Sequence, residues 1–494
     1  MSQGSDRAIG SGPGVADEGG LRATVEIIAT GLGALMAALA QTLIVPVLPE
    51  ISRTIHASAT ASLWLLTSTL LAAAVSVPIL GRLADMFGRR RMLMISLGAL
   101  AAGSVIDALT SNVGVMIAGR ALSGVSSAAI PLGISLLAAT LPQSRKGSAV
   151  ALISAMLGVG AALGLPLAGL IADNASFRVL FWIGAAGALV SVVLIRALVP
   201  EPGHSRDGTV DLPGAVLLSG GLICLILPLS EGSVWGWTAP STLIFFAAAI
   251  VLLALLRVAE NHSPNPLVNL RALANPPVAI TNVAGLFIGF ALFASFVGTS
   301  NYVQEPKATG YGFGSSVFVA GMCLLPSGVL MLVLAPSVPR LSRAWGAGRV
   351  LAAGGALIWA GLLERIFAVG SLWEIIIGTS LVGMGTGIGY AALPTLINSH
   401  TPAHDLAAAN GINSLARALG STFASALGGT ILAGITMTVG GIVVPSLGAY
   451  RVLFAICALA ALLAALAGLI VNRWNPAHSQ GSAPVRSVSA AAGS

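Results

Sequence analysis

The sequence predicts an all-α integral membrane protein built from two six-helix bundles with two extra helices between them. Three observations predict this class. The chain of 494 residues is 56% hydrophobic and only 8% charged, whereas a soluble protein carries about 25% charged residues. Its apolar runs have the length that a bilayer requires. A charged loop between two such runs recurs in the second half of the chain, which indicates an internally duplicated membrane transporter.

Fourteen apolar runs are expected to cross the membrane. They lie at 24–48, 62–80, 92–110, 114–139, 148–171, 179–199, 213–230, 240–259, 278–303, 316–338, 350–369, 373–397, 406–436 and 449–471. An even number of spans places both ends of the chain on the same side of the membrane. Most of the 24 Lys and Arg residues lie in loops on that side. The positive-inside rule therefore makes it the cytoplasmic side of a cell membrane.

The runs divide the chain into five parts. Residues 1–23 and 472–494 are expected to be disordered cytosolic tails, around an N-terminal bundle (24–199), a linker with two extra helices (200–277) and a C-terminal bundle (278–471). The extra pair lies outside the duplicated pattern, so we expect it to leave the wall of the central cavity to the two bundles. Twenty-two Arg against two Lys indicate a GC-rich bacterial genome.

The duplication is visible in two pairs of segments. GRLADMFGRRRML, starting at Gly81, and PRLSRAWGAGRVL, starting at Pro339, lie 258 residues apart and share Arg-Leu, the central Gly, a late Arg and the closing Leu. IAGRALSG from Ile117 and IIGTSLVG from Ile376 align at an offset of 259. Two parallel halves of six spans, with a cavity at their interface, are the geometry that this repeat implies.

The first loop resembles the signature loop of the major facilitator superfamily. Fourteen spans with the extra pair between the halves resemble its drug:H⁺ antiporter branch, over residues 24–471. The resemblance implies a multidrug-efflux-like exporter of small amphiphilic or hydrophobic compounds that works by alternating access, with the proton as candidate co-substrate. A proton-independent facilitator or a dedicated metabolite exporter is the alternative.

The first loop supplies candidate gating residues, namely Gly81, Arg82, Asp85, Gly88, Arg89 and Arg90. The two glycines allow a tight turn and a close backbone approach. Asp85 is the acid among the four arginines of the loop. In the family, the equivalent Asp holds the two halves together through charge pairs and a helix N-terminus. The competing interpretation is that the arginines only orient the neighbouring spans.

Arg120 and Arg417 are the only charges that we place within spans. An Arg at that depth is costly unless it faces a cavity or a partner. The sequence around Arg120 resembles the fourth-span motif of the family, whose Arg is linked to proton movement; the alternative is a side chain that extends outward to the lipid headgroups. Arg417 shares one helix face with Asn410 and Asn413, at i, i+3 and i+7.

Six polar residues within or beside spans are candidates for the substrate cavity, namely Gln41, Asn282, Gln304, Asn398, Asn410 and Asn413. Each one could instead make a hydrogen bond between two helices. We expect at least two of them to face the cavity.

The fifth span contains the run GVGAALGLPLAG, with Gly158, Gly160, Gly164, Pro166 and Gly169. The run resembles the antiporter signature of exporters in this superfamily. Small residues let this helix pack closely against a partner, and Pro166 provides a bend that can act as a hinge. The alternative is ordinary glycine-rich packing.

The first span lacks the acid that the branch carries. Ala40, in LAQTLIVPVLP, occupies the position of the Asp that titrates with the coupling proton in the family, and no other acid lies near the centre of a span. We therefore expect weak proton coupling and a positively charged cavity that favours neutral or acidic compounds over organic cations.

Other functional classes find no support in the sequence. The three cysteines show no CxxC spacing, the six histidines are scattered, and no P-loop occurs. We expect no enzyme activity, no cofactor and no metal. The formal charge of +7 resides in short loops and does not indicate nucleic acid. The expected partners are a small-molecule substrate and the lipid bilayer, and the expected state is a monomer.

Overall fold

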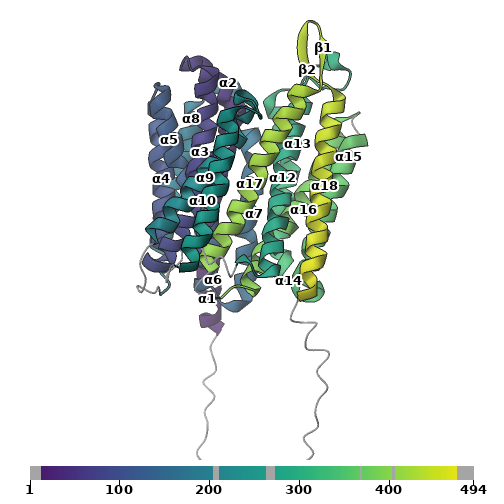
Figure 1. Cartoon of the computed structure of the whole chain (residues 1–494). Helices are drawn as coiled ribbons and strands as arrows, with labels where there is room; N and C mark the ends of the chain where they lie inside the picture. Colours follow the sequence, from purple (N-terminus) through teal and green to yellow (C-terminus); the bar gives the residue numbers. More distant parts are fainter. Residues whose placement is uncertain (1–12, 204–210, 263–272, 368–369, 403–405, 475–494) are drawn as a thin grey trace, which may run out of the picture.

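The computed structural model describes residues 13–203, 211–262, 273–367, 370–402 and 406–474. It is a bundle of long helices that run roughly parallel to one another (Figure 1). The first half contains α1 (Pro13–Thr42), α2 (Ile44–Thr54), α3 (Ala59–Phe87), α4 (Arg89–Leu109), α5 (Val113–Gly124), η1 (Val125–Ala128), α6 (Ala129–Thr140), α7 (Gln143–Asn174) and α8 (Arg178–Leu198).

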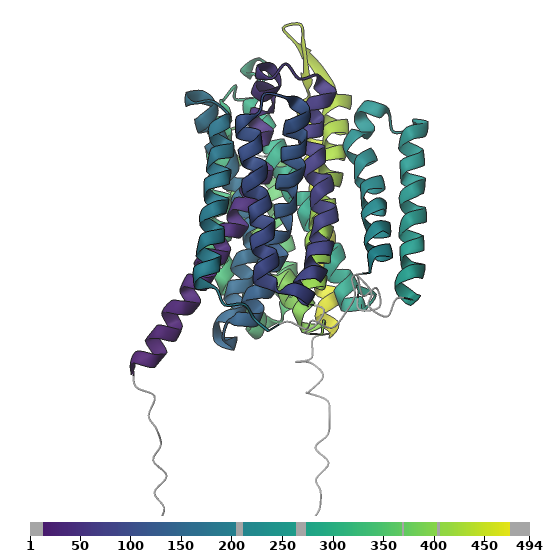
Figure 2. The same cartoon turned by 90° about the vertical axis from the view of Figure 1, so that its left-hand side faces the viewer.

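The extra pair is α9 (Leu212–Trp235) and α10 (Pro240–His262). The second half contains α12 (Pro276–Gln304), η2 (Lys307–Thr309), α13 (Val317–Leu334), η3 (Ala335–Ser337), α14 (Val338–Trp345), α15 (Ala347–Phe367), α16 (Leu372–Ser399), α17 (Leu406–Gly434), β1 (Thr436–Val439), β2 (Ile442–Pro445), α18 (Leu447–Val471) and η5 (Asn472–Trp474). Figure 2 shows α9 and α10 side by side at one edge of the molecule.

The helices match the predicted membrane spans. Among the described residues, 13 helical segments are long and apolar enough to cross a membrane. The remaining predicted span, 406–436, corresponds to α17, which has 29 residues and lies against α3, α9 and α12. Large apolar side chains such as Leu189, Ile244 and Leu459 are more than half exposed, as expected for residues that face lipid.

Two predicted boundaries need correction. Helix α1 begins at Pro13, so residues 13–23 are helical and not a disordered tail; proline is favoured in the first turn of a helix. Residues 472–474 of the predicted C-terminal tail form η5, and the remainder of the two tails, 1–12 and 475–494, lies outside the described residues. After α17, residues 436–445 form an antiparallel hairpin whose turn contains Gly440 and Gly441, both with positive φ.

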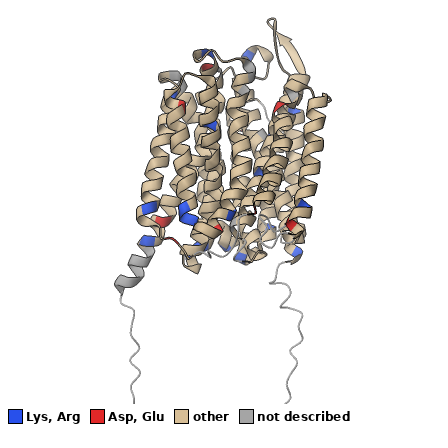
Figure 3. Ribbon diagram, turned by 60° about the vertical axis from the view of Figure 1, so that its left-hand side comes forward, with Lys and Arg blue, Asp and Glu red and all other residues tan. Residues whose placement is uncertain are grey.

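The two ends of the bundle are defined by these elements. We call the end where α1 begins and α18 ends the terminal face, and the end that carries the β1–β2 hairpin the hairpin face (Figure 1). Figure 3 shows that charged residues gather near the ends of the helices and that few lie between them. This distribution is the one that a membrane protein requires.

The internal repeat is reproduced in the backbone. Helices α4 and α15 both have 21 residues, and their first residues lie at equivalent positions of the repeat. In α4, a Cβ at Gly103 would lie 2.4 Å from the carbonyl oxygen of Gly119 in α5. In α15, a Cβ at Gly361 would lie 2.6 Å from the carbonyl oxygen of Gly378 in α16. The two halves therefore use the same close helix crossing.

Candidate substrate cavity and gating loop

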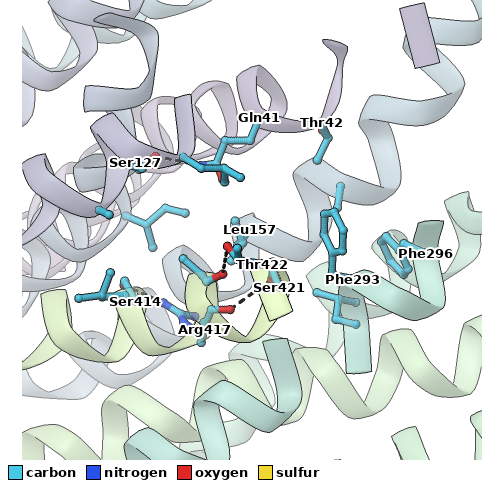
Figure 4. A pocket seen from close by; sticks show the side chains of 18 of the residues that line it. Gln41, Thr42, Ser127, Leu157, Phe293, Phe296, Ser414, Arg417, Ser421 and Thr422 are labelled. Carbon is cyan, nitrogen blue, oxygen red and sulfur yellow. Dashed lines mark hydrogen bonds between the residues drawn. The ribbon is translucent and has the colours of Figure 1, made fainter. Parts of the chain in front are cut away.

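A cavity with an empty volume of about 1310 Å³ lies between the two halves. Its wall is mostly apolar and is formed by α1, α2, α3, η1, α6, α7, α9, α12, α16 and α17. Figure 4 shows Gln41 on α1 across the cavity from Arg417 on α17, with Phe293 and Phe296 of α12 beside them. We call this space the Arg417 chamber.

A second space, of about 1010 Å³, continues from the first toward the hairpin face. The two share Gln41, Phe293 and Ser421 among their lining residues, so they form one cavity. The second space is lined by Arg120, and we call it the Arg120 chamber. No Asp or Glu is among the residues that line either chamber.

The extra helix α9 takes part in the cavity wall, contrary to the sequence prediction. Ile226 lines the Arg417 chamber, and Leu229 and Ser230 line the Arg120 chamber. Helix α9 contacts α3 in the first half and α17 in the second. It therefore contacts both halves beside the cavity, a position that the repeat pattern could not indicate because α9 lies outside it.

Arg417 is buried and surrounded by partners. Its Nη1 donates to the Ser154 hydroxyl at 3.1 Å, and its Nη2 donates to the Ser414 hydroxyl at 2.9 Å. The guanidinium also lies 4.7 Å from the centroid of the Tyr390 ring. Ser154 belongs to α7 of the first half, so Arg417 of the second half connects the two bundles. Arg417 is among the residues that line the Arg417 chamber.

Arg120 is 2% exposed and has fewer partners. Its Nη2 donates to the carbonyl oxygen of Ala40 at 3.0 Å, and its Nε has no hydrogen-bond partner among the described residues. The side chain lies inside the bundle, so the alternative of a side chain extended to the headgroups is excluded. Ala40 is the residue at the position of the first-span acid of the family.

The predicted polar residues mostly bind one another. Among the six candidates, only Gln41 lines the cavity, where its amide nitrogen lies 3.3 Å from the Ser127 hydroxyl. The other five line neither chamber, and the expectation that at least two face the cavity stays a prediction. Asn413 donates to Asn282 and Asn410 donates to Asn398, while Gln304 donates to Ser300 of its own helix. These amides satisfy one another across or along helices, which the helical periodicity of α17 alone could not reveal.

The prediction that Arg120 and Arg417 are the only charges within spans is also wrong. Arg365 in α15 is fully buried, and so is Asp107 in α4. Glu231 in α9 is 1% exposed and accepts a hydrogen bond of 3.0 Å from Thr67, which lines the Arg120 chamber. Hydropathy places these residues near the ends of apolar runs but does not show whether they face water or the protein interior.

The glycine run of α7 lies between α1 and α13. A Cβ at Gly160 would lie 2.4 Å from Ala38 of α1, and one at Gly169 would lie 2.6 Å from the backbone of Phe318 of α13. Gly164 approaches Thr42 of α1 and Gly158 approaches Met331 of α13 in the same way. Pro166 lies inside α7, where its backbone is close to Gly321 of α13. These small residues bring one helix of the first half against a helix of the second.

A second acid, Glu201, lies beside the gating loop, although it is not part of the loop sequence. Asp85 pairs with Arg89 at 3.4 Å. Glu201, which follows α8, accepts hydrogen bonds from the backbone nitrogens of Arg90 and Arg91 at 3.1 Å and lies 3.7 Å from the Arg90 guanidinium. Asp85 is therefore not the only acid among the four arginines.

The remaining loop residues have structural positions. Gly88 has a φ of +105°, and a Cβ there would lie 2.8 Å from the Glu201 carboxyl. Gly81 and Arg82 lie in the last turns of α3. Near the terminal face, the Ser148 hydroxyl of α7 donates to the carbonyl oxygen of Pro336 at 3.1 Å, so the two halves also contact each other at this end of the bundle.

The sequence analysis missed several cavity residues. Ser414, Ser421 and Thr422 of α17 line the Arg417 chamber, as do Phe293 and Tyr390. The signal for the first group was present, because Ser414, Arg417 and Ser421 recur at i, i+3 and i+7 and so continue the polar face of α17. The aromatic residues carry no such signal within apolar helices.

Comparisons with known proteins agree with this architecture. A family model described as Major Facilitator Superfamily matches residues 30–425. The multidrug resistance protein Stp of Mycobacterium tuberculosis is 28% identical over 410 residues, which cover 82% of this chain and 75% of that protein. The tetracenomycin C resistance and export protein of Streptomyces glaucescens is 28% identical over 416 residues, with the same coverage. The human organic anion transporter MFSD10 has the same fold, with a TM-score of 0.60 at 16% identity over 90% of this chain and 99% of that one.

Proposed function

This chain belongs to the major facilitator superfamily, and we propose that it exports small amphiphilic or hydrophobic compounds of neutral or acidic character across the cytoplasmic membrane of a bacterium. The observation that carries the proposal is the cavity between the halves. Its wall is mostly apolar, its charged lining residues are Arg120 and Arg417, and no acid lines it. Such a site disfavours organic cations, because two like charges at 4 Å repel by about 4 kcal/mol at an effective dielectric of about 20.

The direction of transport is supported by the relatives. The Mycobacterium and Streptomyces proteins are named for multidrug resistance and for resistance and export. The glycine run of α7, at the contact between α1 and α13, is the segment that resembles the antiporter signature. We assign Pro166 in this run as the hinge that changes shape between the two facings of the cavity.

The terminal face is the cytoplasmic face in this proposal. Arg82, Arg89, Arg90 and Arg91 all lie at that face, as the positive-inside rule requires. The gate consists of the loop with the Asp85–Arg89 pair and, elsewhere on the same face, the contact between α7 and η3 that joins the two halves. Alternating access then requires these contacts to break before the cavity opens to the cytoplasm.

Transport into inside-out membrane vesicles tests the proposal. We expect faster uptake of a neutral and of an acidic amphiphile than in vesicles that lack the protein, and no uptake of the quaternary ammonium dye ethidium. Strong uptake of ethidium driven by an imposed pH gradient would contradict the charge preference. A gradient-driven uptake that is lost in Asp107→Asn or in Glu231→Gln would identify that carboxyl as the proton site.

A further inference from the structure

The two cavity arginines differ in how many of their donors are used. A guanidinium carries five N–H donors. Two of the three guanidinium nitrogens of Arg417 donate to the hydroxyls of Ser154 and Ser414, and the guanidinium lies over the Tyr390 ring. Arg120 makes one side-chain hydrogen bond to the described residues, with the Ala40 carbonyl oxygen, and the Nε of each of the two arginines lacks a partner among them. Arg120 is thus the cavity cation with donors to spare.

Asp107, a buried acid close to Arg120, also makes no hydrogen bonds to the described residues. Asp107 is fully buried, and neither carboxylate oxygen has a hydrogen-bond partner among the described residues. One of these oxygens packs against Gly119, the residue that precedes Arg120. The two side chains nevertheless form no ion pair within 4.0 Å. A buried guanidinium and a buried carboxylate that are not joined leave both charges poorly compensated.

The chamber beside Arg120 offers a further free donor. Ser230 of α9 lines this chamber, and its hydroxyl is buried without a hydrogen-bond partner. Phe293 lines both chambers, and Leu292 and Phe296 continue the apolar wall into the Arg417 chamber. A ligand that spans the cavity therefore meets unsatisfied donors at one end and aromatic and aliphatic side chains at the other.

We propose that the Arg120 chamber is a binding subsite for the carboxylate of an amphiphilic organic acid whose apolar body occupies the Arg417 chamber. Arg120 and the Ser230 hydroxyl donate to the carboxylate, and charged donors of this kind make short, strong hydrogen bonds. Asp107 is the internal counterion of Arg120 and competes with the ligand for it. This inference rests on the proposed function and names the substrate class for the same cavity.

A matched pair of probes tests the subsite. Pyrenebutyrate and its methyl ester share one apolar body and differ in charge, and energy transfer from tryptophan to pyrene reports their binding to the full chain in lipid nanodiscs, with empty nanodiscs as the blank. We expect the wild-type protein to bind the acid roughly tenfold more tightly than the ester, which is the effect of about one charge-assisted hydrogen bond. Equal affinities would overturn the proposal.

Variants separate binding from folding. Arg120→Gln should remove the preference for the acid and leave the affinity for the ester nearly unchanged, and Arg120→Lys, which keeps the charge, should restore part of it. Asp107→Asn should raise the affinity for the acid roughly threefold or more, because the competing charge is gone. A damaged fold would lower the affinity for both probes. An equal loss of acid and ester binding in both Arg120→Gln and Arg120→Lys therefore counts against the subsite. An unchanged or lower affinity for the acid in Asp107→Asn also counts against it.

Efflux from proteoliposomes distinguishes this inference from the proposed function. If the wild-type protein moves both probes at equal rates, the carboxylate subsite is wrong and the exporter stands. If it moves neither probe nor any other neutral or acidic amphiphile, the proposed function itself fails.

Discussion

The two halves share a backbone but carry charges of opposite sign at two pairs of equivalent positions. Asp85 in the first loop corresponds to Arg343 in the second, and Asp107 at the end of α4 corresponds to Arg365 at the end of α15. Asp85 pairs with Arg89, whereas Arg343 donates to the Pro339 carbonyl oxygen of its own helix. The acids are found in the half that carries the gating loop.

The buried pair differs even more in its surroundings. Arg365 is enclosed by aromatic rings, with its guanidinium 5.2 Å from the centroid of Tyr302 and 5.1 Å from that of Phe454. None of its nitrogens has a hydrogen-bond partner among the described residues. Asp107 instead packs against Gly119, the residue that precedes Arg120, and lines neither chamber of the cavity. The glycines of the crossings are the same in both halves. The comparison therefore shows that the duplication keeps this packing, whereas the charge at these two pairs of positions is specific to each half.

The largest effect should come from the shared crossing. Gly103→Leu and Gly361→Leu each force a side chain onto a backbone carbonyl, at 2.4 and 2.6 Å for the Cβ alone. Backbone atoms cannot rotate away, so we expect the free energy of unfolding of each variant to fall by about 3 kcal/mol. Most of the folded protein should then be lost. Fluorescence-detected size exclusion measures the loss.

Gly98→Leu is the matched control, because nothing lies within 4 Å of a Cβ at Gly98 of α4. Its abundance should stay close to that of the wild type. A large loss in only one of the two crossings would show that the halves do not depend equally on the shared packing.

The next largest effect concerns the loops. Asp85→Asn should abolish transport while protein abundance stays nearly unchanged, because it removes a charge from the gate and no buried apolar contact. Arg343→Gln at the equivalent position of the second half, and Arg90→Ala within the same loop, should do much less. Vesicle transport normalised to the amount of protein checks this prediction. Equal losses of transport in all three variants would mean that the first loop has no special gating role and only orients the neighbouring spans.

A smaller effect of opposite sign is expected at Arg365. Arg365→Met removes a buried charge that makes no hydrogen bond and replaces it with an apolar side chain of similar length. Such replacements are often neutral or stabilise the fold by about 1–4 kcal/mol. The loss of the cation–π contacts should destabilise it by about 0.5–2 kcal/mol. The melting temperature in detergent should stay equal or rise, with transport retained; a clear drop would give this arginine a structural role that its contacts do not explain.

The smallest effect should come from Glu201→Gln. The ion pair with Arg90 spans 3.7 Å between side chains that are 23% and 25% exposed, and such pairs contribute about 1 kcal/mol or less. An amide oxygen can still accept from the backbone of Arg90. We therefore expect a melting temperature within a few degrees of the wild type. A loss of transport as large as that of Asp85→Asn would instead assign the gating role to Glu201.

The sequence predicts the arrangement along the chain well, for identifiable reasons. Apolar runs of membrane length are local patterns, so α3 to α8 and α12 to α16 fall where hydropathy places them. The repeated loops predict that α4 and α15 begin at equivalent positions, which the structure confirms. The depth of Arg120 and Arg417 within their helices also follows from position alone.

What the sequence could not provide is the identity of neighbours across the bundle. Glu201 reaches Arg90 from 111 residues away, and Ser154 reaches Arg417 from 263 residues away. Asn282 and Asn413 look like two independent cavity residues until packing joins them. Periodicity gives the face of a helix but not the helix that covers it.

The sequence by itself therefore determined that this chain spans a membrane as two related halves with an extra pair, because each of these properties is encoded in contiguous residues. Only the tertiary structure decided that α9 lines the cavity, that Arg417 is enclosed by partners and that Arg120 keeps unsatisfied donors beside Asp107. The reason is physical: the cost of a buried charge depends on which groups from distant helices surround it, and those distances are set by helix packing.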